Sequence, residues 1–77
     1  MNYKFKIYTG PTTVKEVAEA LRSSGVYVYL EGTEHVYIAS PCEEIYDTNV
    51  YVQTRLLETH GKRFGILHSD FSFLGEA

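Results

Sequence analysis

Two hydrophobic periodicities alternate along this chain in a fixed order. Apolar residues recur at every second position, the period of a half-buried strand, in residues 3–8, 26–30, 35–39 and 63–68. They recur at helical spacing in residues 14–24 and 41–60. The sequence therefore predicts the order strand, helix, strand, strand, helix, strand.

A chain of 77 residues has room for one hydrophobic core, so both amphipathic helices must pack on the same sheet. Right-handed connections then give an α+β fold, the ferredoxin-like βαββαβ sandwich, with a four-stranded antiparallel sheet and two helices on one face. Residues 1–77 form a single domain in this interpretation. Phe71 and Phe73 alternate with their neighbours and would add a short fifth strand at the C-terminus. Because this topology hosts many unrelated functions, the function has to be argued from the side chains.

Capping signals set the expected ends of the two helices. Thr13 and Ser40 each precede a glutamate by three residues, which is the spacing of a capping box. We therefore expect their hydroxyls to cap helices that begin at residues 14 and 41. Gly25 and Gly61 stand where a glycine commonly ends a helix.

Two segments are locally less regular. Residues 47–52 contain poor helix formers, so the second helix could break near Asn49 or run there as a strand, although we expect it to stay helical. Residues 31–34 are expected to form a hairpin turn in which Gly32 supplies a positive φ.

The alternation also predicts which side chains each face of the sheet carries. Nine apolar residues should point toward the helices: Phe5, Ile7, Val26, Val28, Leu30, Val36, Ile38, Phe64 and Ile66. The opposite face, which no helix covers, should carry Lys4, Lys6, Tyr8, Tyr27, Tyr29, His35 and Tyr37. Four tyrosines and two lysines on an uncovered face are the most unusual feature of the sequence.

Three interpretations of this tyrosine–lysine face compete. Aromatic cross-strand pairs and lysine stems can simply stabilise and cover a sheet. Tyrosine is also enriched at protein interfaces, so the face could bind a partner protein or form a homodimer. Alternatively, bases of a single-stranded nucleic acid could stack on the tyrosines while Lys4 and Lys6 hold phosphates. The glycine-and-aromatic signature of sheet-based RNA binders is absent, which disfavours this last interpretation.

The second helix offers another candidate binding surface. Tyr51 is expected on its polar side, one turn from Asp47 and Arg55, with Glu44 and Glu58 beyond. A tyrosine among carboxylates would suit a basic partner surface. The alternative is an ordinary solvated helix face with one amphipathic residue.

Residues with catalytic or metal-binding potential are few. Cys42, the single cysteine, is expected near the N-terminus of the second helix, where the helix dipole favours a thiolate. Its candidate bases are His35 and His68, but no catalytic cysteine signature surrounds it. These two histidines and His60 lack the spacing of a metal site. We therefore expect that the protein is not an enzyme and binds no metal or cofactor, and that Cys42 has a structural role.

The net charge and the hydropathy of the sequence limit which classes of partner and which cellular location we expect. Ten acids against seven bases give a net charge of −3, which disfavours a general binder of duplex DNA. No apolar run reaches the about 18–20 residues that span a bilayer, so we expect no membrane contact. Residues 1–6 alternate polar and apolar side chains, unlike a signal peptide, which favours a cytoplasmic location.

These observations favour a small non-catalytic binding module that regulates or inhibits a partner protein by masking its surface. Small acidic domains without catalytic residues include many such regulators, among them phage-encoded inhibitors of host defence such as anti-CRISPR proteins. Single-stranded nucleic-acid binding through the tyrosine–lysine face is the alternative.

Overall fold

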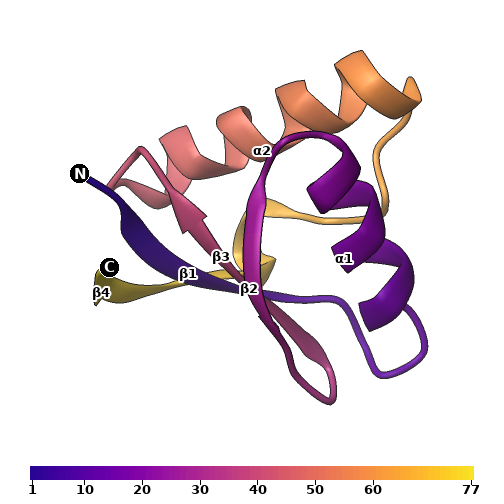
Figure 1. Cartoon of the computed structure of the whole chain (residues 1–77), viewed down its shortest axis with the longest axis horizontal. Helices are drawn as coiled ribbons and strands as arrows, with labels where there is room; N and C mark the ends of the chain where they lie inside the picture. Colours follow the sequence, from indigo (N-terminus) through magenta and orange to yellow (C-terminus); the bar gives the residue numbers. More distant parts are fainter.

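Both helices pack on one face of a four-stranded antiparallel sheet (Figure 1). The computed structural model describes residues 1–77. Its elements are β1 (Tyr3–Tyr8), α1 (Val14–Ser23), β2 (Tyr27–Glu31), β3 (His35–Ser40), α2 (Ile45–His60), a 3₁₀ turn (His68–Asp70) and β4 (Phe71–Glu76). The strands lie side by side in the order β2-β3-β1-β4. The predicted ferredoxin-like arrangement is confirmed. Neither helix has the length and hydrophobicity needed to cross a membrane.

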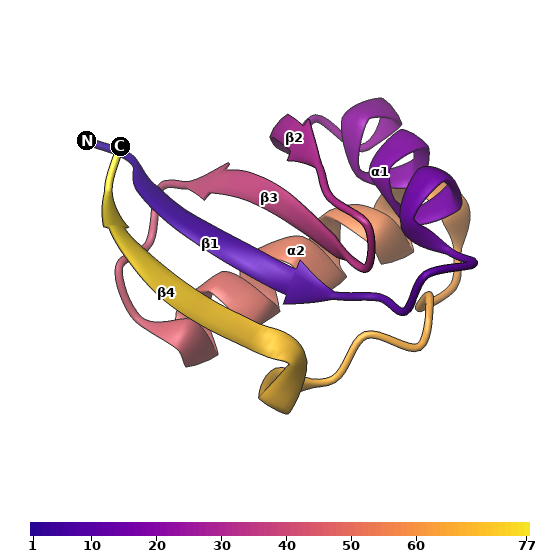
Figure 2. The ribbon, with the colours of Figure 1, turned by 90° about the horizontal axis from the view of Figure 1, so that it is seen from below.

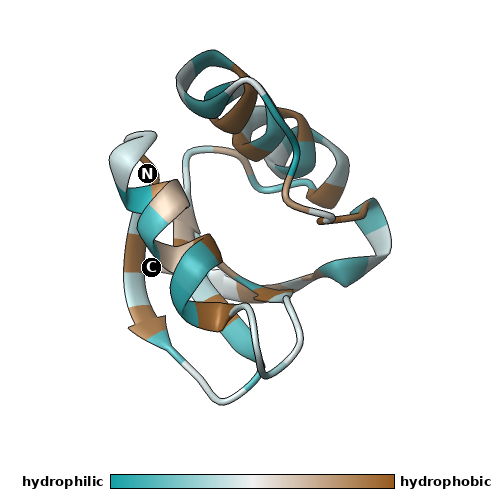
Figure 3. Cartoon of the chain, turned by 90° about the vertical axis from the view of Figure 1, so that its right-hand side faces the viewer, coloured by the Kyte–Doolittle hydropathy of each residue, from teal (hydrophilic) through white to brown (hydrophobic).

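The core lies between the sheet and the two helices and contains fifteen buried apolar residues. Phe5 and Ile7 of β1 and Ile38 of β3 are fully buried beneath Leu21 of α1 and Leu56 of α2. Figure 3 shows both helices banded with hydrophobic and hydrophilic positions, as expected of helices that bury one side only. Each such side chain contributes roughly 1.5–3 kcal/mol by leaving water, so the alternation of the central strands fixes which sheet face the helices cover.

The predicted capping boxes are wrong at both helices. Helix α1 begins at Val14 as expected, but the Thr13 hydroxyl donates to the carbonyl oxygen of Thr9 and caps nothing. Helix α2 begins at Ile45 rather than at residue 41. The cause is Ser40, which stays in β3 and is fully buried there. Its hydroxyl is used in hydrogen bonds with the Cys42 N–H and with Thr48 of α2.

The other local expectations for α2 are confirmed. Residues 47–52 are helical throughout, so the helix neither breaks near Asn49 nor becomes a strand. Burial of Val52 and Leu56 against the core outweighs the poor helix propensity of this segment. Gly61 ends α2 with a φ of 70°, and Gly25 follows α1 with a φ of 84°. Both values are in the left-handed region that glycine tolerates.

A β-bulge in β2 changes which side chains face the core. Val28 lies opposite Ile38, but Leu30 lies opposite Tyr37, so Tyr29 is an extra residue in β2. The register slip turns Leu30 away from the helices, contrary to the predicted inward orientation, and leaves it 51% exposed. It also turns Glu31 toward α1.

The hairpin turn that follows β2 differs from the expectation at Gly32. Its φ is not positive. Glycine is needed there for close approach instead, because a Cβ would lie 3.1 Å from both the His35 carbonyl oxygen and Cε1 of Tyr37. The turn thus packs its backbone directly against the tyrosine–lysine face.

The strand predicted at residues 63–68 is wrong, whereas the short C-terminal strand predicted at Phe71 and Phe73 is present and is the fourth strand of the sheet, not a fifth. Residues 62–67 are irregular, and Gly65 adopts a φ of 75°, which breaks an extended strand. Strand β4 starts at Phe71 instead and pairs with β1, placing Phe71 opposite Ile7. Phe71 is buried beside the central strand, whereas Ile66 reaches the core from the loop and Phe64 packs against it. The strand beside β1 is therefore β4, which buries Phe71, and not residues 63–68, which contain Gly65.

Candidate functional site

The face of the sheet opposite the helices is uncovered, as Figure 2 shows from that side. Residues on this face alternate along the central strands with the buried core residues. We call this surface the open face. Its residues are Lys4, Lys6 and Tyr8 of β1, His35, Tyr37 and Ala39 of β3, Tyr27, Tyr29 and Leu30 of β2, and Ser72 of β4.

Four aromatic rings form a continuous row across the open face. The ring centroids of Tyr8 and His35 are 5.4 Å apart with an edge-to-face angle of 72°. The His35 and Tyr37 centroids are 6.4 Å apart, and those of Tyr37 and Tyr29 are 6.1 Å apart. These are the separations of attractive aromatic pairs, and a tyrosine pair such as Tyr29–Tyr37 contributes about 0.5–1.5 kcal/mol beyond burial. The row therefore orients the rings before any partner arrives.

Three of the four exposed large apolar or aromatic side chains that we assign to the open face lie on β2, and the fourth is Tyr8 of β1. Tyr27 is 67% exposed, and Tyr29 and Leu30 are also exposed beside it. Desolvation by burial, followed by the neighbouring Tyr37, raises the pKa of the Tyr29 phenol above its usual 10.0. Leu30 belongs to this surface because of the bulge, which the strict alternation of apolar residues does not predict.

The two charged side chains on the open face, Lys4 and Lys6, are both positive. Lys4 lies opposite Ala39, and Lys6 lies opposite Tyr37 and Ser72. The chain contains a single ion pair, between Arg22 and Glu31, so neither lysine is neutralised by a carboxylate.

The only carboxylates on the four strands lie on the helix side. Glu31 pairs with Arg22 of α1, and Glu76 lies opposite Tyr3, which packs against the core. The open face thus combines an aromatic row with two free ammonium groups and has no acid among its residues.

The predicted surface on α2 does not form around an exposed tyrosine. Tyr51 is half-buried, packs against the core and lies beneath the Arg55 guanidinium, 5.3 Å from ring centroid to Cζ. Asp47 is exposed on α2, and Glu44 is the exposed N-cap residue. Tyr51 therefore offers no free ring for a basic partner.

Cys42 lies in the loop before α2, two residues ahead of the N-cap, and not in the first turn as predicted. The dipole argument for a thiolate therefore does not apply. Its backbone, rather than its thiol, bonds to Ser40 and Thr48. The structure brings neither His35 on the open face nor His68 in the 3₁₀ turn into hydrogen-bond contact with it.

No group of three His, Cys, Asp or Glu side chains is arranged to hold a metal ion. The three histidines lie apart: His35 belongs to the aromatic row, His68 lies near Tyr46, and His60 lies at the end of α2.

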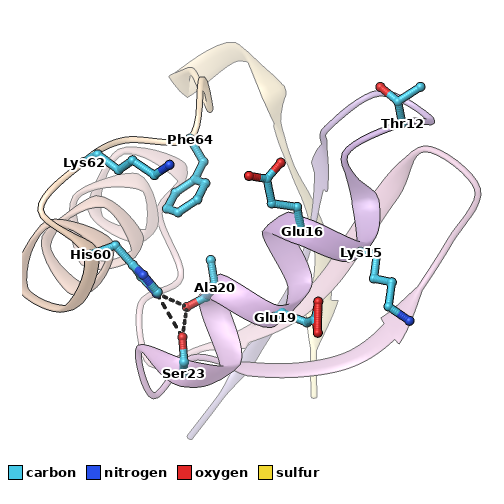
Figure 4. A pocket seen from close by; sticks show the side chains of 9 residues that line it. All are labelled: Thr12, Lys15, Glu16, Glu19, Ala20, Ser23, His60, Lys62 and Phe64. Atoms are coloured by element: carbon cyan, nitrogen blue, oxygen red, sulfur yellow. Dashed lines mark hydrogen bonds between the residues drawn. The ribbon is translucent and has the colours of Figure 1, made fainter.

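The largest groove, of about 730 Å³, lies between α1 and the segment that follows α2 (Figure 4). Its walls carry Glu16 and Glu19 on one side and Lys62 and Phe64 on the other. His60 Nε2 lies 2.9 Å from Ser23 Oγ and 3.2 Å from the carbonyl oxygen of Ala20. Ser23 Oγ also donates to that carbonyl, so both groups bond to the last turn of α1. The histidine lacks a hydrogen-bonded carboxylate, so this pair is a helix-end contact and not a nucleophile with its base.

The open face is therefore the candidate functional site, because it joins a row of four aromatic rings to two unpaired lysines on a face that no helix covers. The groove beside α1 and the surface around Tyr51 are explained by contacts within the fold. The chain matches no protein-family model, no curated protein and no solved structure.

Proposed function

We propose that this chain is a small binding protein without chemistry of its own, which docks a partner protein on the open face. It regulates or inhibits the partner by covering part of the partner's surface. The observation that carries this proposal is the pre-ordered aromatic row flanked by Lys4 and Lys6 on a face that has no carboxylate.

The kind of partner follows from the chemistry of the face. Exposed Tyr27, Tyr29 and Leu30 supply the apolar bodies that anchor protein interfaces. Uncovered aromatic surface of this kind marks interaction sites in soluble proteins. Two lysines without acids favour a partner surface that is itself acidic, since complementary charge steers and orients association.

A second candidate function is binding of single-stranded nucleic acid. Lys4 and Lys6 lie on β1 at the centre of the sheet, next to the row of Tyr8, His35 and Tyr37. Aromatic rings beside cations are the usual platform for stacked bases and their phosphates. The rings tilt against one another by 50–72°, however, and such mutual edge contacts occupy part of the surface that bases would need.

Matched tyrosine variants test whether the open face is the binding site. Tyr27 on the open face and Tyr46 on α2 are each 67% exposed, so Tyr46→Ala controls for the loss of an equally exposed ring. We expect Tyr27→Ala and Tyr29→Ala each to weaken partner binding about 5–30-fold, roughly 1–2 kcal/mol, while Tyr46→Ala does not. The partner is first isolated from a lysate of the source organism treated with nuclease, and affinities are then measured with the purified pair. Equal losses for Tyr27→Ala and Tyr46→Ala would show that the open face is not the site.

Direct titration separates the two candidate functions. A labelled single-stranded oligonucleotide is titrated with the protein and with the Lys4→Ala/Lys6→Ala variant over a range of salt concentrations. The protein-partner proposal expects no oligonucleotide binding at physiological salt. Binding that weakens with salt and is lost in the lysine variant would replace it with the nucleic-acid function.

A further inference from the structure

Helix α2 carries a second apolar surface, on the side away from the open face. Tyr46, Val50 and Leu57 are exposed along one side of the helix, and Leu67 is exposed beside them. We call these four residues the α2 patch. They line a groove of about 350 Å³ between α2 and residues 63–68. Tyr46, Val50 and Leu57 recur at helical spacing on one side of α2, and all three are exposed.

The wall of this groove is held in place by one side chain. Gln53 is buried, and its Nε2 donates to the carbonyl oxygen of Ile66 at 2.8 Å and to Asn49 Oδ1 at 3.3 Å. These bonds attach the irregular loop to α2 next to the exposed Leu67. The patch is therefore a fixed feature of the folded chain.

The stripe begins at Tyr46 and ends at Leu57, so its midpoint lies between Tyr51 and Val52. Val50 lies next to that point, and the position equally far on its other side is the buried Gln53. A second copy of α2 packed antiparallel about a two-fold axis at that point would set Tyr46 against Leu57 of the other copy. Such an isologous contact uses the same patch twice and closes on itself.

The charges at the two ends of α2 complement each other in the same arrangement. Glu43, Glu44 and Asp47 lie at its N-terminal end, whereas its C-terminal end carries one acid, Glu58, and is followed by Lys62 beside α1 and by Arg63, which lines the groove. None of these groups forms an ion pair within the chain. Antiparallel pairing brings the acidic end of one copy to the basic end of the other, whereas parallel pairing sets like charges together.

We propose that the α2 patch binds the α2 patch of a second copy of this chain, which gives an antiparallel two-fold dimer. The apolar stripe supplies the contact area, and the opposite charges at its ends set the direction of the two helices. The dimer leaves both open faces free. This interface is independent of the function proposed for the open face.

Oligomeric state tests the proposal. Sedimentation velocity of the purified chain from about 1 μM to about 1 mM should show a monomer that converts to a dimer as concentration rises. Val50→Asp and Leu57→Asp should each weaken the dimer at least tenfold. Leu30→Asp, an equally drastic change on the open face, should leave it intact. All three positions are exposed, so we expect each variant to remain folded, and circular dichroism checks this.

A charge exchange tests the direction of the helices. Glu43→Lys/Glu44→Lys should weaken the dimer several-fold, and adding Lys62→Glu/Arg63→Glu to the same chain should restore it. A monomer over the whole range overturns the proposal, as does a dimer that resists Leu57→Asp. A dimer lost in Leu30→Asp overturns it too, because it moves the interface to the open face. Failure of the charge exchange to restore the dimer refutes the antiparallel arrangement.

Discussion

Replacing Thr48 with valine removes the centre of the buried hydrogen bonds that join β3 to α2. Thr48 Oγ1 donates to the Cys42 carbonyl oxygen at 3.0 Å, and Ser40 Oγ accepts the Cys42 N–H at 3.0 Å. The two hydroxyl oxygens lie 2.9 Å apart, and Ser40 must donate to Thr48 because the Thr48 proton is already used. Both side chains are fully buried, so no water can replace the hydrogen bond between their hydroxyls.

The size of the effect follows from these contacts. Valine keeps the shape of threonine but leaves the Ser40 hydroxyl and the Cys42 carbonyl without their partner. Unpaired buried groups of this kind cost about 1–3 kcal/mol, so we expect Thr48→Val to lower the free energy of unfolding by about 2 kcal/mol. For a domain of this size, that corresponds to a fall in Tm of about 8–16 °C.

Urea unfolding followed by circular dichroism measures this loss. Thr13→Val is the matched control, because the Thr13 hydroxyl makes one hydrogen bond, to the half-buried Thr9, and should cost only about 0.5–1.5 kcal/mol. The variant Ser40→Ala/Thr48→Val should lose less than the sum of its single changes, since each already breaks the shared bond. If Thr48→Val is no less stable than Thr13→Val, the buried hydrogen bonds do not hold the start of α2.

Two further predictions concern the open face. Tyr29 should titrate above pH 10 in an absorbance titration of the phenolate. The folded chain holds this proton more tightly than the unfolded one, so its contribution to stability is complete below pH 10 and is lost as pH rises through the raised pKa. Tyr37→Phe should lower the Tyr29 pKa, and an unchanged titration would contradict an electrostatic effect of the Tyr37 hydroxyl on Tyr29. Gly32→Ala should lower the free energy of unfolding by about 1 kcal/mol or more, because its Cβ meets the His35 carbonyl oxygen and the Tyr37 ring at 3.1 Å. A gain of stability on thermal unfolding would show that the turn can relax.

Local hydrophobic patterns predict the secondary structure correctly where the packing of the fold agrees with them. The alternation of residues 3–8 and 35–39 predicts strands β1 and β3, because their apolar residues have only one face to bury. The same alternation places Lys6, Tyr8 and Tyr37 on the open face. The sequence therefore predicts the order of the elements and most residues of the candidate site.

Longer-range choices could not be predicted from local patterns. The local sequence is compatible both with a helix that Ser40 caps and with one that begins at Ile45. The second is found because Ser40 lies beside Thr48 in the fold and forms a hydrogen bond with it. The bulge at Tyr29 likewise depends on the register between β2 and β3. Without that register, the alternation predicts Leu30 to be a core residue. The last strand depends on whether residues 63–68 or Phe71 and its neighbours pair with β1.

The net charge of the chain is a poor guide to the charge of its open face, because the sheet separates side chains by register. The acids of β2 and β4 lie on the helix side, and the two lysines of β1 lie on the other. At physiological salt, charges farther than about 8 Å are screened, so a bound partner responds chiefly to these lysines and not to the total of −3. Two lysines can neutralise two phosphates of a single strand, which limits the slope of log affinity against log salt to about −1.4. A steeper slope would therefore require basic residues outside the open face and would place part of the contact beyond it.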